Sequence, residues 1–152
     1  MTPTHLSVVS MPLETRREAV LHLATTADRL GYDSIYLPET WSWDVTVALA
    51  ELASRTRSIR LGSAVLGIWG RSAATLAMAA STLHAVSEGR FTLGLGVSTG
   101  QLAEGFHDVP FDAPVARLRP PPPGPVSPRR LRPRRPRLGC HQLWEHTSAA
   151  AS

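Results

Sequence analysis

The feature that most constrains the fold is a regular alternation of short apolar runs and amphipathic segments over residues 5–97. The apolar runs have the length and branched side chains of buried strands, and they are His5–Ser10, Ser34–Leu37, Ile59–Leu66 and Phe91–Val97. Between them, apolar residues three and four positions apart predict helices over residues 15–30, 45–53 and 72–86. Helices of this length suit right-handed crossovers between parallel strands. The order therefore predicts an α/β fold, either a doubly wound open sheet or a TIM barrel.

Residues at the ends of these segments agree with the helix assignments. Asp44 and Ser72 each stand directly before a helical segment, where a side-chain oxygen can accept a hydrogen bond from a free backbone N–H. Gly31 and Gly89 follow helical segments, where a left-handed residue commonly ends a helix.

The alternation stops at about Arg119. Eight of the 13 Pro residues lie between Pro120 and Pro136, a density that neither a helix nor an interior strand tolerates. We therefore expect one domain over residues 1–119 and a disordered Pro/Arg-rich tail over residues 120–152. All 16 basic residues are Arg, and the tail holds six of them against one acid. The positive charge thus belongs to the tail, and the body gives no reason to expect nucleic acid as a partner.

The cellular location follows from what the chain lacks. Its one Cys, Cys140, cannot form an internal disulfide, so nothing supports export to an oxidising compartment. The first residues do not have the charged region and apolar core of a signal peptide. No apolar run approaches the roughly 18 residues that a membrane span needs. We therefore expect a cytoplasmic protein without a membrane partner.

The stretch GRFTLGLGVSTGQ, residues 89–101, raises the question of a nucleotide-binding glycine loop. A dinucleotide fingerprint has the spacing G-x-G-x-x-G after the first strand of its unit. Gly94, Gly96 and Gly100 are instead spaced G-x-G-x-x-x-G and follow the fourth strand, and a P-loop would need a Lys that the chain lacks. We favour a strand end at which glycine either permits close packing or leaves room for a ligand.

Two other strand ends carry polar and aromatic residues. LPETWSWD, residues 37–44, contains Glu39 and two Trp, and LGSAVLGIWGRS, residues 61–72, contains three Gly. Taken alone, each also fits an ordinary packed loop, so the two alternatives stay open at this point.

Together, these segments resemble the bacterial luciferase-like monooxygenase family. The similarity covers roughly residues 5–119 and is most specific in ATLAMAASTL, GRFTLGLGVS and EGFHDVPF. It points in particular to the branch that uses coenzyme F420, with FMN as the alternative cofactor. It implies a TIM barrel of about 250 residues, of which this chain has about the first four β/α units. It also implies an oxidoreductase or monooxygenase that acts on a small organic substrate, and a homodimer for an intact member.

The resemblance further implies where the cofactor would bind. In the family, a bulge after the third strand, often with a cis peptide, backs the cofactor ring, and the loop after the fourth strand and an acid after the second strand contact it. The matching positions in this chain are Ala64, Val65, Gly67, Ser98, Thr99, Gly100, Gln101 and Glu39. His107 is the candidate on the substrate side.

The same resemblance leaves the catalytic residues unassigned. The sugar-phosphate dehydrogenase branch has His and Glu where this chain has Thr40 and Gln101. Neither Thr nor Gln is a good general acid or base near neutral pH. The chemistry of that branch is therefore not expected, and no residue is predicted to act as a catalytic acid or base.

The end of the similarity suggests a hypothesis about the tail. Family members continue with four more strands where this chain has Pro120–Pro123, so a frameshift near the codon for Arg119 would explain the change and would leave a weakly active or inactive chain. The alternative is a basic interaction module whose segment RRLRPRRPR binds nucleic acid or acidic partners, although a solvated tail is favoured. Cys140, His141 and His146 match no zinc spacing, so no metal site is predicted.

Overall fold

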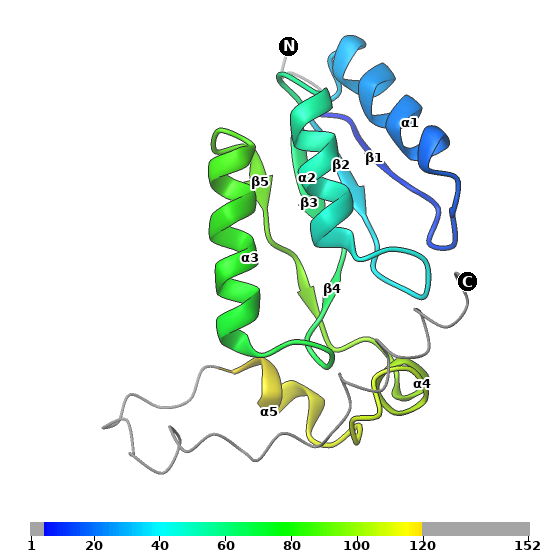
Figure 1. The fold of residues 1–152 in the computed structure, drawn as a ribbon, viewed down its shortest axis with the longest axis vertical. Coiled ribbons are helices and arrows are strands. Elements are labelled where there is room, and N and C mark those ends of the chain that lie inside the picture. Colours follow the sequence, from blue (N-terminus) through cyan, green and yellow to red (C-terminus); the bar gives the residue numbers. More distant parts are fainter. Residues whose placement is uncertain (1–4, 120–152) are drawn as a thin grey trace, which may run out of the picture. The chain divides into compact units, whose positions relative to one another are not determined.

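The computed structural model describes residues 5–119 (Figure 1). Strands and helices alternate along the chain in the predicted order, with additional breaks in two strands. The elements are β1 (Ser7–Val9), α1 (Arg17–Arg29), β2 (Ser34–Leu37), α2 (Val45–Arg55), β3 (Arg60–Ser63), β4 (Leu66–Gly67), α3 (Ala73–Val86), β5 (Phe91–Thr92), β6 (Leu95–Gly96), α4 (Gly100–Gly105) and α5 (Pro114–Leu118). No helix within residues 5–119 has both the length and the apolar character needed to cross a membrane.

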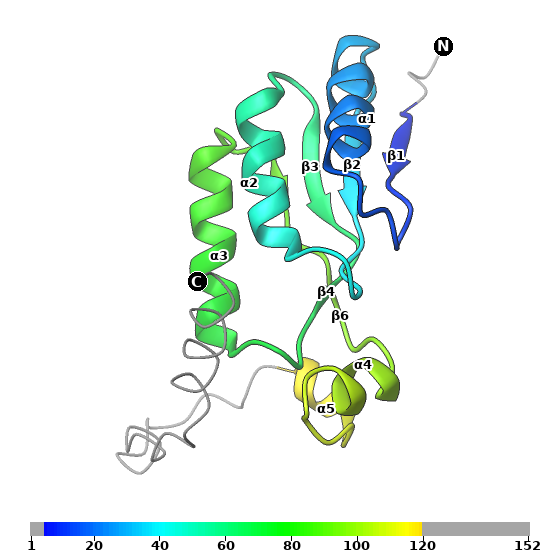
Figure 2. The ribbon, with the colours of Figure 1, turned by 45° about the vertical axis from the view of Figure 1, so that its right-hand side comes forward.

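Four strands form a parallel sheet in the order β1-β2-β3-β5, and β4 pairs with β6 in a second parallel sheet. Ile35 lies opposite Val8 on one side and Leu61 on the other, and Leu61 in turn pairs with Phe91. In both ribbon views α1, α2 and α3 lie side by side along one face of the sheet (Figures 1 and 2). An open doubly wound sheet has helices on both faces, so this arrangement is the one expected for part of a barrel.

The core lies between these helices and the sheet. Ala24 of α1 and Leu49 of α2 are fully buried, as are Ile35 of β2 and Leu61 of β3. The apolar faces predicted from the helical spacing are therefore the faces that pack on the strands. Burying one such aliphatic side chain stabilises the fold by about 1.5–3 kcal/mol.

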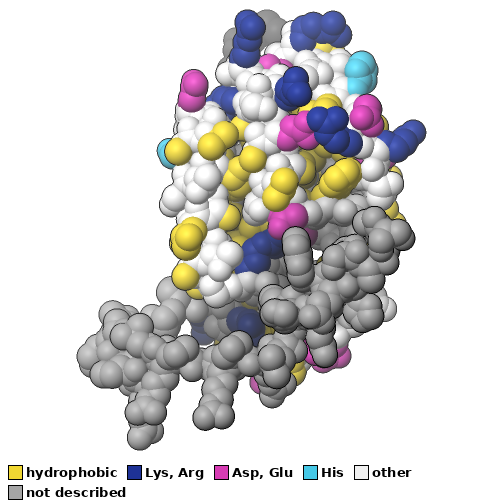
Figure 3. All heavy atoms as spheres, in the orientation of Figure 1, with side chains coloured by type: hydrophobic (Ala, Val, Ile, Leu, Met, Phe, Trp, Pro, Cys, Tyr) yellow, Lys and Arg dark blue, Asp and Glu magenta, His cyan; other side chains and the backbone are white. Residues whose placement is uncertain are grey.

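Exposed hydrophobic side chains remain on the outer sides of the helices. Figure 3 shows them along α2 and α3, and they include Val47, Met78 and Val86, which are 68%, 70% and 50% exposed. α3 is built largely of Ala and so has little polar surface of its own. Isolated apolar residues on a surface are ordinary, and none of these lies at the carboxyl ends of the strands.

The helix ends have the predicted structures. The Asp44 carboxylate accepts a hydrogen bond from the Thr46 N–H at 2.9 Å, and the Ser72 hydroxyl accepts one from the Thr75 N–H at 3.1 Å. Gly31 adopts a φ of 77°, as expected for the left-handed residue after a helix. α1 starts at Arg17, two residues later than expected, and its N-cap residue makes no side-chain cap.

One carboxylate joins the end of α1 to the segment that enters β3. Asp28 accepts hydrogen bonds from the backbone N–H groups of Arg57, Ser58 and Ile59 at 2.7–2.9 Å. Burial alone would raise the pKa of Asp28, but these donors and the Ser58 hydroxyl lower it to about 2. This carboxylate therefore holds the α2–β3 connection against α1.

One guanidinium joins the entry of β5 to the end of α2. Arg90 donates hydrogen bonds to the carbonyl oxygens of Ala53, Thr56 and Ile59 at 2.9–3.2 Å, and also to that of Ser87. These carbonyl groups lie at helix ends and in loops, where the regular helix pattern does not pair them. Arg90 thus fixes α3 and β5 relative to α2 and β3.

Two predicted strands are each broken in the structure. The run Ile59–Leu66 becomes β3 and β4, and the run Phe91–Val97 becomes β5 and β6. The strands break where the Ser63 side chain, rather than the backbone of β3, makes the hydrogen bonds to the neighbouring strand. The Ser63 hydroxyl accepts a hydrogen bond from the Gly94 N–H at 3.0 Å and donates one to the Gly94 carbonyl oxygen at 2.9 Å. The regular ladder ends there and resumes between β4 and β6.

Several expectations fall on residues that the structure does not describe. These are the tail over residues 120–152, its basic segment, and the group formed by Cys140, His141 and His146. The domain boundary at Arg119 and the frameshift hypothesis stay predictions.

Candidate cofactor and substrate site

The candidate residues gather at one edge of the sheet because parallel strands bring their carboxyl ends together. Glu39 follows β2, the segment Ala64–Val65 follows β3, Gly67 ends β4, and Ser98 follows β6 (Figure 1). In a TIM barrel this edge carries the active site.

The bulge between β3 and β4 lies at this edge of the sheet and is hydrogen-bonded to the segment at the end of β2. The peptide bond between Ala64 and Val65 is cis, at the position that the family resemblance implies. The Ala64 N–H donates to the Leu37 carbonyl oxygen at 2.9 Å, and the Glu39 N–H donates to the Val65 carbonyl oxygen at 3.3 Å. These bonds hold the bulge against the end of β2. The Val65 side chain is 40% exposed and Ala64 is exposed, so the bulge presents small apolar groups at the edge.

Gly94 and Gly96 allow the chain to pack against this bulge. A Cβ atom on Gly96 would lie 2.2 Å from Cγ2 of Val65, and one on Gly94 would lie 2.2 Å from the Ser63 carbonyl oxygen. The expectation that Gly96 leaves room for a ligand is therefore wrong, because the protein's own Val65 fills that space. The alternative, a close approach of backbone and side chain at a strand end, is what the structure shows.

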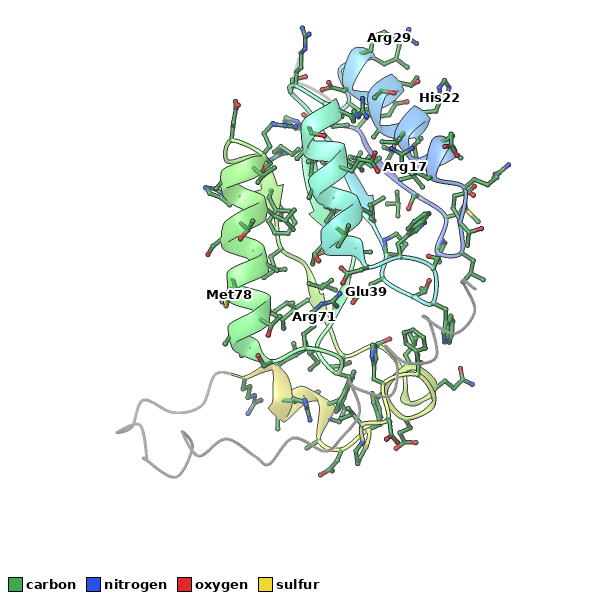
Figure 4. The ribbon with its side chains drawn as sticks, in the orientation of Figure 1. Arg17, His22, Arg29, Glu39, Arg71 and Met78 are labelled. Carbon is green, nitrogen blue, oxygen red and sulfur yellow. The ribbon has the colours of Figure 1, made fainter. Side chains whose placement is uncertain are left out.

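An ion-pair network surrounds Glu39. One oxygen of Glu39, Oε2, accepts hydrogen bonds from the Gly67 N–H at 3.1 Å and from Nη1 of Arg71 at 2.6 Å. Nη2 of Arg71 lies 3.0 Å from Oδ2 of Asp44. The side chains of Glu39 and Arg71 are 9% and 15% exposed and point toward one another in Figure 4.

The electrostatics of this network favour the charged forms of Arg71 and Asp44. The hydrogen bond that Arg71 donates to Glu39 raises the pKa of Arg71, and the attraction of Asp44 adds to it. Burial alone would raise the pKa of Asp44, but hydrogen bonds from Thr46 and Arg71 lower it. Glu39 is therefore a fixed, paired hydrogen-bond acceptor, suited to orientation rather than to proton transfer.

Sequence reasoning named Glu39 as a candidate site residue but did not name Arg71, with which Glu39 is paired. The partners of Arg71 lie about 30 positions away in the chain, and only the meeting of the strand ends brings them together. The available signal was the position of Arg71, the one cation between the third strand and the Ser72 cap. A cation at a strand end that faces an acid at the neighbouring strand end is a candidate for such a pair.

The segment after β6 is more ordered than a loop. Ser98 has a φ of 54°, and Thr99 caps α4 by accepting a hydrogen bond from the Leu102 N–H at 3.4 Å. Gly100 and Gln101 form the first turn of α4, and the Gln101 side chain is exposed. The expectation of a loop over these positions is thus corrected at Gly100 and Gln101, which are helical.

A pocket of about 320 Å³ lies beside Glu39. Its lining comes from the segment after β2, the segment before α3 and the end of α4: Glu39, Thr40, Trp41, Ser42, Trp43, Asp44, Gly70, Arg71, Phe106 and His107. The His107 ring packs on Gly70, where a Cβ atom would lie 2.6 Å from Cε1 of the ring. The structure thus brings Glu39 and His107 into one pocket, whereas Val65 and Ser98 lie outside its lining.

The exposed residues at the bulge fit a flat ring better than a phosphate or a metal. Val65 and Ala64 offer apolar surface, and Glu39 and the Gly67 N–H already satisfy one another. Among residues 5–119 there is no cluster of three or more His, Cys, Asp or Glu side chains suited to a metal ion.

The family model described as luciferase-like monooxygenase matches residues 1–119. The chain belongs to this family. A protein of Mycobacterium tuberculosis named as a coenzyme F420-dependent oxidoreductase is 40% identical over 97 residues, which are 64% of this chain and 28% of that protein. The luciferase-like chain therefore spans less than a third of that relative's length.

Solved structures of similar shape give the same fold. The monooxygenase RslO1 from Streptomyces bottropensis has a TM-score of 0.69 at 24% identity, covering 75% of this chain and 39% of that one. The oxygenating constituent of 3,6-diketocamphane monooxygenase from Pseudomonas putida, solved with FMN, has a TM-score of 0.61 at 21% identity, covering 69% and 32%. At these identities the likeness shows the fold alone, which is that of part of a luciferase-like TIM barrel.

Proposed function

We propose that this luciferase-like chain carries part of the cofactor site of an oxidoreductase that uses coenzyme F420 and acts on a small organic substrate. The observation that carries the proposal is the bulge at Ala64–Val65, held at the carboxyl edge of the sheet beside the buried pair of Glu39 and Arg71. The name of the relative that is 40% identical supports the choice of cofactor.

Each residue has a separate part in this proposal. Ala64 and Val65 back the cofactor ring with apolar surface, and Gly67 and Glu39 fix the position of the bulge through their hydrogen bond. Ser98, Thr99, Gly100 and Gln101 lie at the next strand end and would bound the ring on that side. The bound cofactor would supply or accept a hydride, whereas the protein residues bind and orient it.

FMN is the alternative cofactor, and with it the chemistry would be oxygen activation by a monooxygenase. The FMN complex among the similar structures motivates this alternative. Either ring would use the same apolar backing at Val65, so the two cofactors are distinguished by measured binding.

We further propose that this chain binds its cofactor weakly, because it holds about four of the eight β/α units of a barrel. The frameshift hypothesis offers one origin for such a chain, and resequencing the gene from the codon for Gly100 onward tests it. The intact enzyme would be a homodimer. The comparisons do not support the alternative of a basic interaction module.

Equilibrium dialysis of the full purified chain against coenzyme F420, and separately against FMN, tests the cofactor proposal. We expect saturable retention of coenzyme F420 with a Kd on the order of 0.1–1 mM, or about −5.5 to −4 kcal/mol, and weaker retention of FMN. Val65→Asp, which places a charge on the ring-backing surface, should reduce retention, and Val115→Asp on exposed α5 serves as the matched control. Submicromolar binding would contradict the partial site, and no retention of either cofactor would contradict the cofactor site itself.

A further inference from the structure

The pocket beside Glu39 is lined by both aromatic and charged side chains. Two walls carry aromatic rings: Trp41 and Trp43 in the segment before α2, and Phe106 and His107 at the end of α4. The carboxylates of Glu39 and Asp44 and the guanidinium of Arg71 also line the pocket.

Two of the aromatic rings that line the pocket are half exposed, and the Phe106 ring packs edge-on against the His107 ring with the ring centroids 4.9 Å apart. Trp41 and Phe106 are each 53% exposed although both are large apolar side chains. Trp43 is held in place because its indole N–H donates a hydrogen bond to the Glu14 carbonyl oxygen at 2.7 Å. Aromatic rings that line a pocket can bind a planar molecule or a cation through their π faces.

With His counted as neutral, the two carboxylates and the one guanidinium of the lining carry a formal net charge of −1. Both terminal nitrogens of Arg71 are occupied, Nη1 by Glu39 and Nη2 by Asp44. The positive charge of Arg71 is therefore already shared between two carboxylates, and an anionic ligand would have to compete with both of them for it. The second carboxylate, Asp44, is half exposed and keeps its charge facing solvent.

From these contacts we propose that this pocket binds an aromatic substrate that is uncharged or cationic, and that it rejects anionic ones. This inference rests on the proposed function, because it names the substrate class of the same site. The aromatic walls supply the affinity, and the excess carboxylate supplies the discrimination by repelling a like charge. A volume of about 320 Å³ suits a molecule of one or two rings.

Three probes of one shape test the discrimination: naphthalenemethanol, naphthylmethylammonium and naphthoate. Each is dialysed to equilibrium against the full chain, at a pH between the pKa values of the probe carboxyl and ammonium groups. We expect the uncharged and cationic probes to bind at least about tenfold more tightly than naphthoate. Equal or tighter binding of naphthoate overturns the proposal, as does the absence of binding by all three.

Asp44→Asn removes the excess charge and keeps the helix cap, because Asn and Asp cap helices about equally well. In this variant the preference against naphthoate should fall to about threefold or less, as expected when one like charge is removed. Asp33→Asn is the matched control, since it makes the same change at the other end of β2, where Asp33 pairs with His5. An unchanged preference in Asp44→Asn overturns the proposal.

Trp41→Ala tests the aromatic wall in an exposed segment whose folding it should not disturb. All three probes should weaken by about threefold to tenfold, the effect of losing one aromatic contact. Undiminished binding would place the probes elsewhere and overturn the proposal.

Dialysis of the same protein against coenzyme F420 separates the two claims. If the probes discriminate but no cofactor is retained, the proposed function fails and the pocket selectivity stands. If cofactor is retained but the probes do not discriminate, only the substrate inference fails.

Discussion

Single charged side chains hold the segments between strands in place. Asp28 binds three consecutive backbone N–H groups, Arg90 binds four carbonyl oxygens, and Arg71 bridges two carboxylates. Each side chain supplies hydrogen bonds for groups that have no partner within their own loop. Arg71 does this at the carboxyl ends of the strands, where the candidate site lies, whereas Asp28 and Arg90 do it at the entries to β3 and β5.

Asp28→Asn should change how stability depends on pH. The folded pKa of Asp28 is about 2 against an ordinary 3.8, so its stabilisation is complete above 3.8 and is lost as the pH falls toward 2. The variant should be less stable at neutral pH by about 1–3 kcal/mol, the usual effect of weakening hydrogen bonds to a charged group. It should also lose this part of the acid dependence. Urea unfolding of the full chain at a series of pH values measures both effects.

Asp112→Asn, at an exposed position before α5, is the matched control and should leave the curve unchanged. Parallel stability curves for Asp28→Asn and the wild-type chain across the acid range would show that the pKa of Asp28 is not lowered by folding.

At the residue scale, sequence reasoning succeeded where the cause is local. Asp44, Ser72 and Gly31 were predicted at helix ends because capping depends only on neighbouring residues. Arg71 was missed, and the role of Asp44 beyond its cap was missed with it. Their pairing depends on two segments that meet only in the folded sheet.

At the scale of elements, the order and type of strands and helices were predictable, but the breaks in two strands were not. Hydrophobic runs define where a strand lies and cannot show where its ladder stops. The breaks depend on Ser63 and Gly94, which are 31 positions apart and exchange two hydrogen bonds. The bulge at Ala64–Val65 was expected only through the family resemblance.

Gly96→Ala should destabilise the fold because its Cβ would overlap Val65. We expect a loss of about 1–3 kcal/mol, typical of overpacking. Val65→Ala in the same chain should restore much of it, since removing Cγ2 removes the nearest clash. A double-mutant cycle by urea unfolding should give a coupling energy of about 0.5–3 kcal/mol.

Gly105→Ala is the control for that cycle, because a Cβ there would meet nothing within 4 Å. A loss in Gly96→Ala that Val65→Ala does not relieve would mean that the two side chains are not in contact.

At the scale of the whole molecule, residues 5–119 form part of a barrel whose outer strands are β1 and β5. Helices on a single face distinguished the barrel from the doubly wound sheet, a choice that strand and helix order alone left open (Figure 2). Both outer strands carry backbone groups that a neighbouring strand would pair in a complete barrel.

The chain should therefore self-associate when purified. Sedimentation velocity over a range of concentrations should show species larger than a monomer, because unpaired strand edges pair with other chains. Val9→Lys, at the end of β1 where Val9 is 58% exposed, should shift the distribution toward monomer. Val115→Lys, at a similarly exposed position on α5, should not. A monomer at every concentration would contradict the expectation of open edges.

The central claim is that the cofactor binds at the bulge between β3 and β4. The amide NMR spectrum of the isotopically labelled full chain, titrated with coenzyme F420, tests it most directly. We predict that the largest shifts fall on Val65, Gly67 and Ser98. Shifts confined to the outer helices α1 and α2, or no shifts at saturating cofactor, would contradict the account.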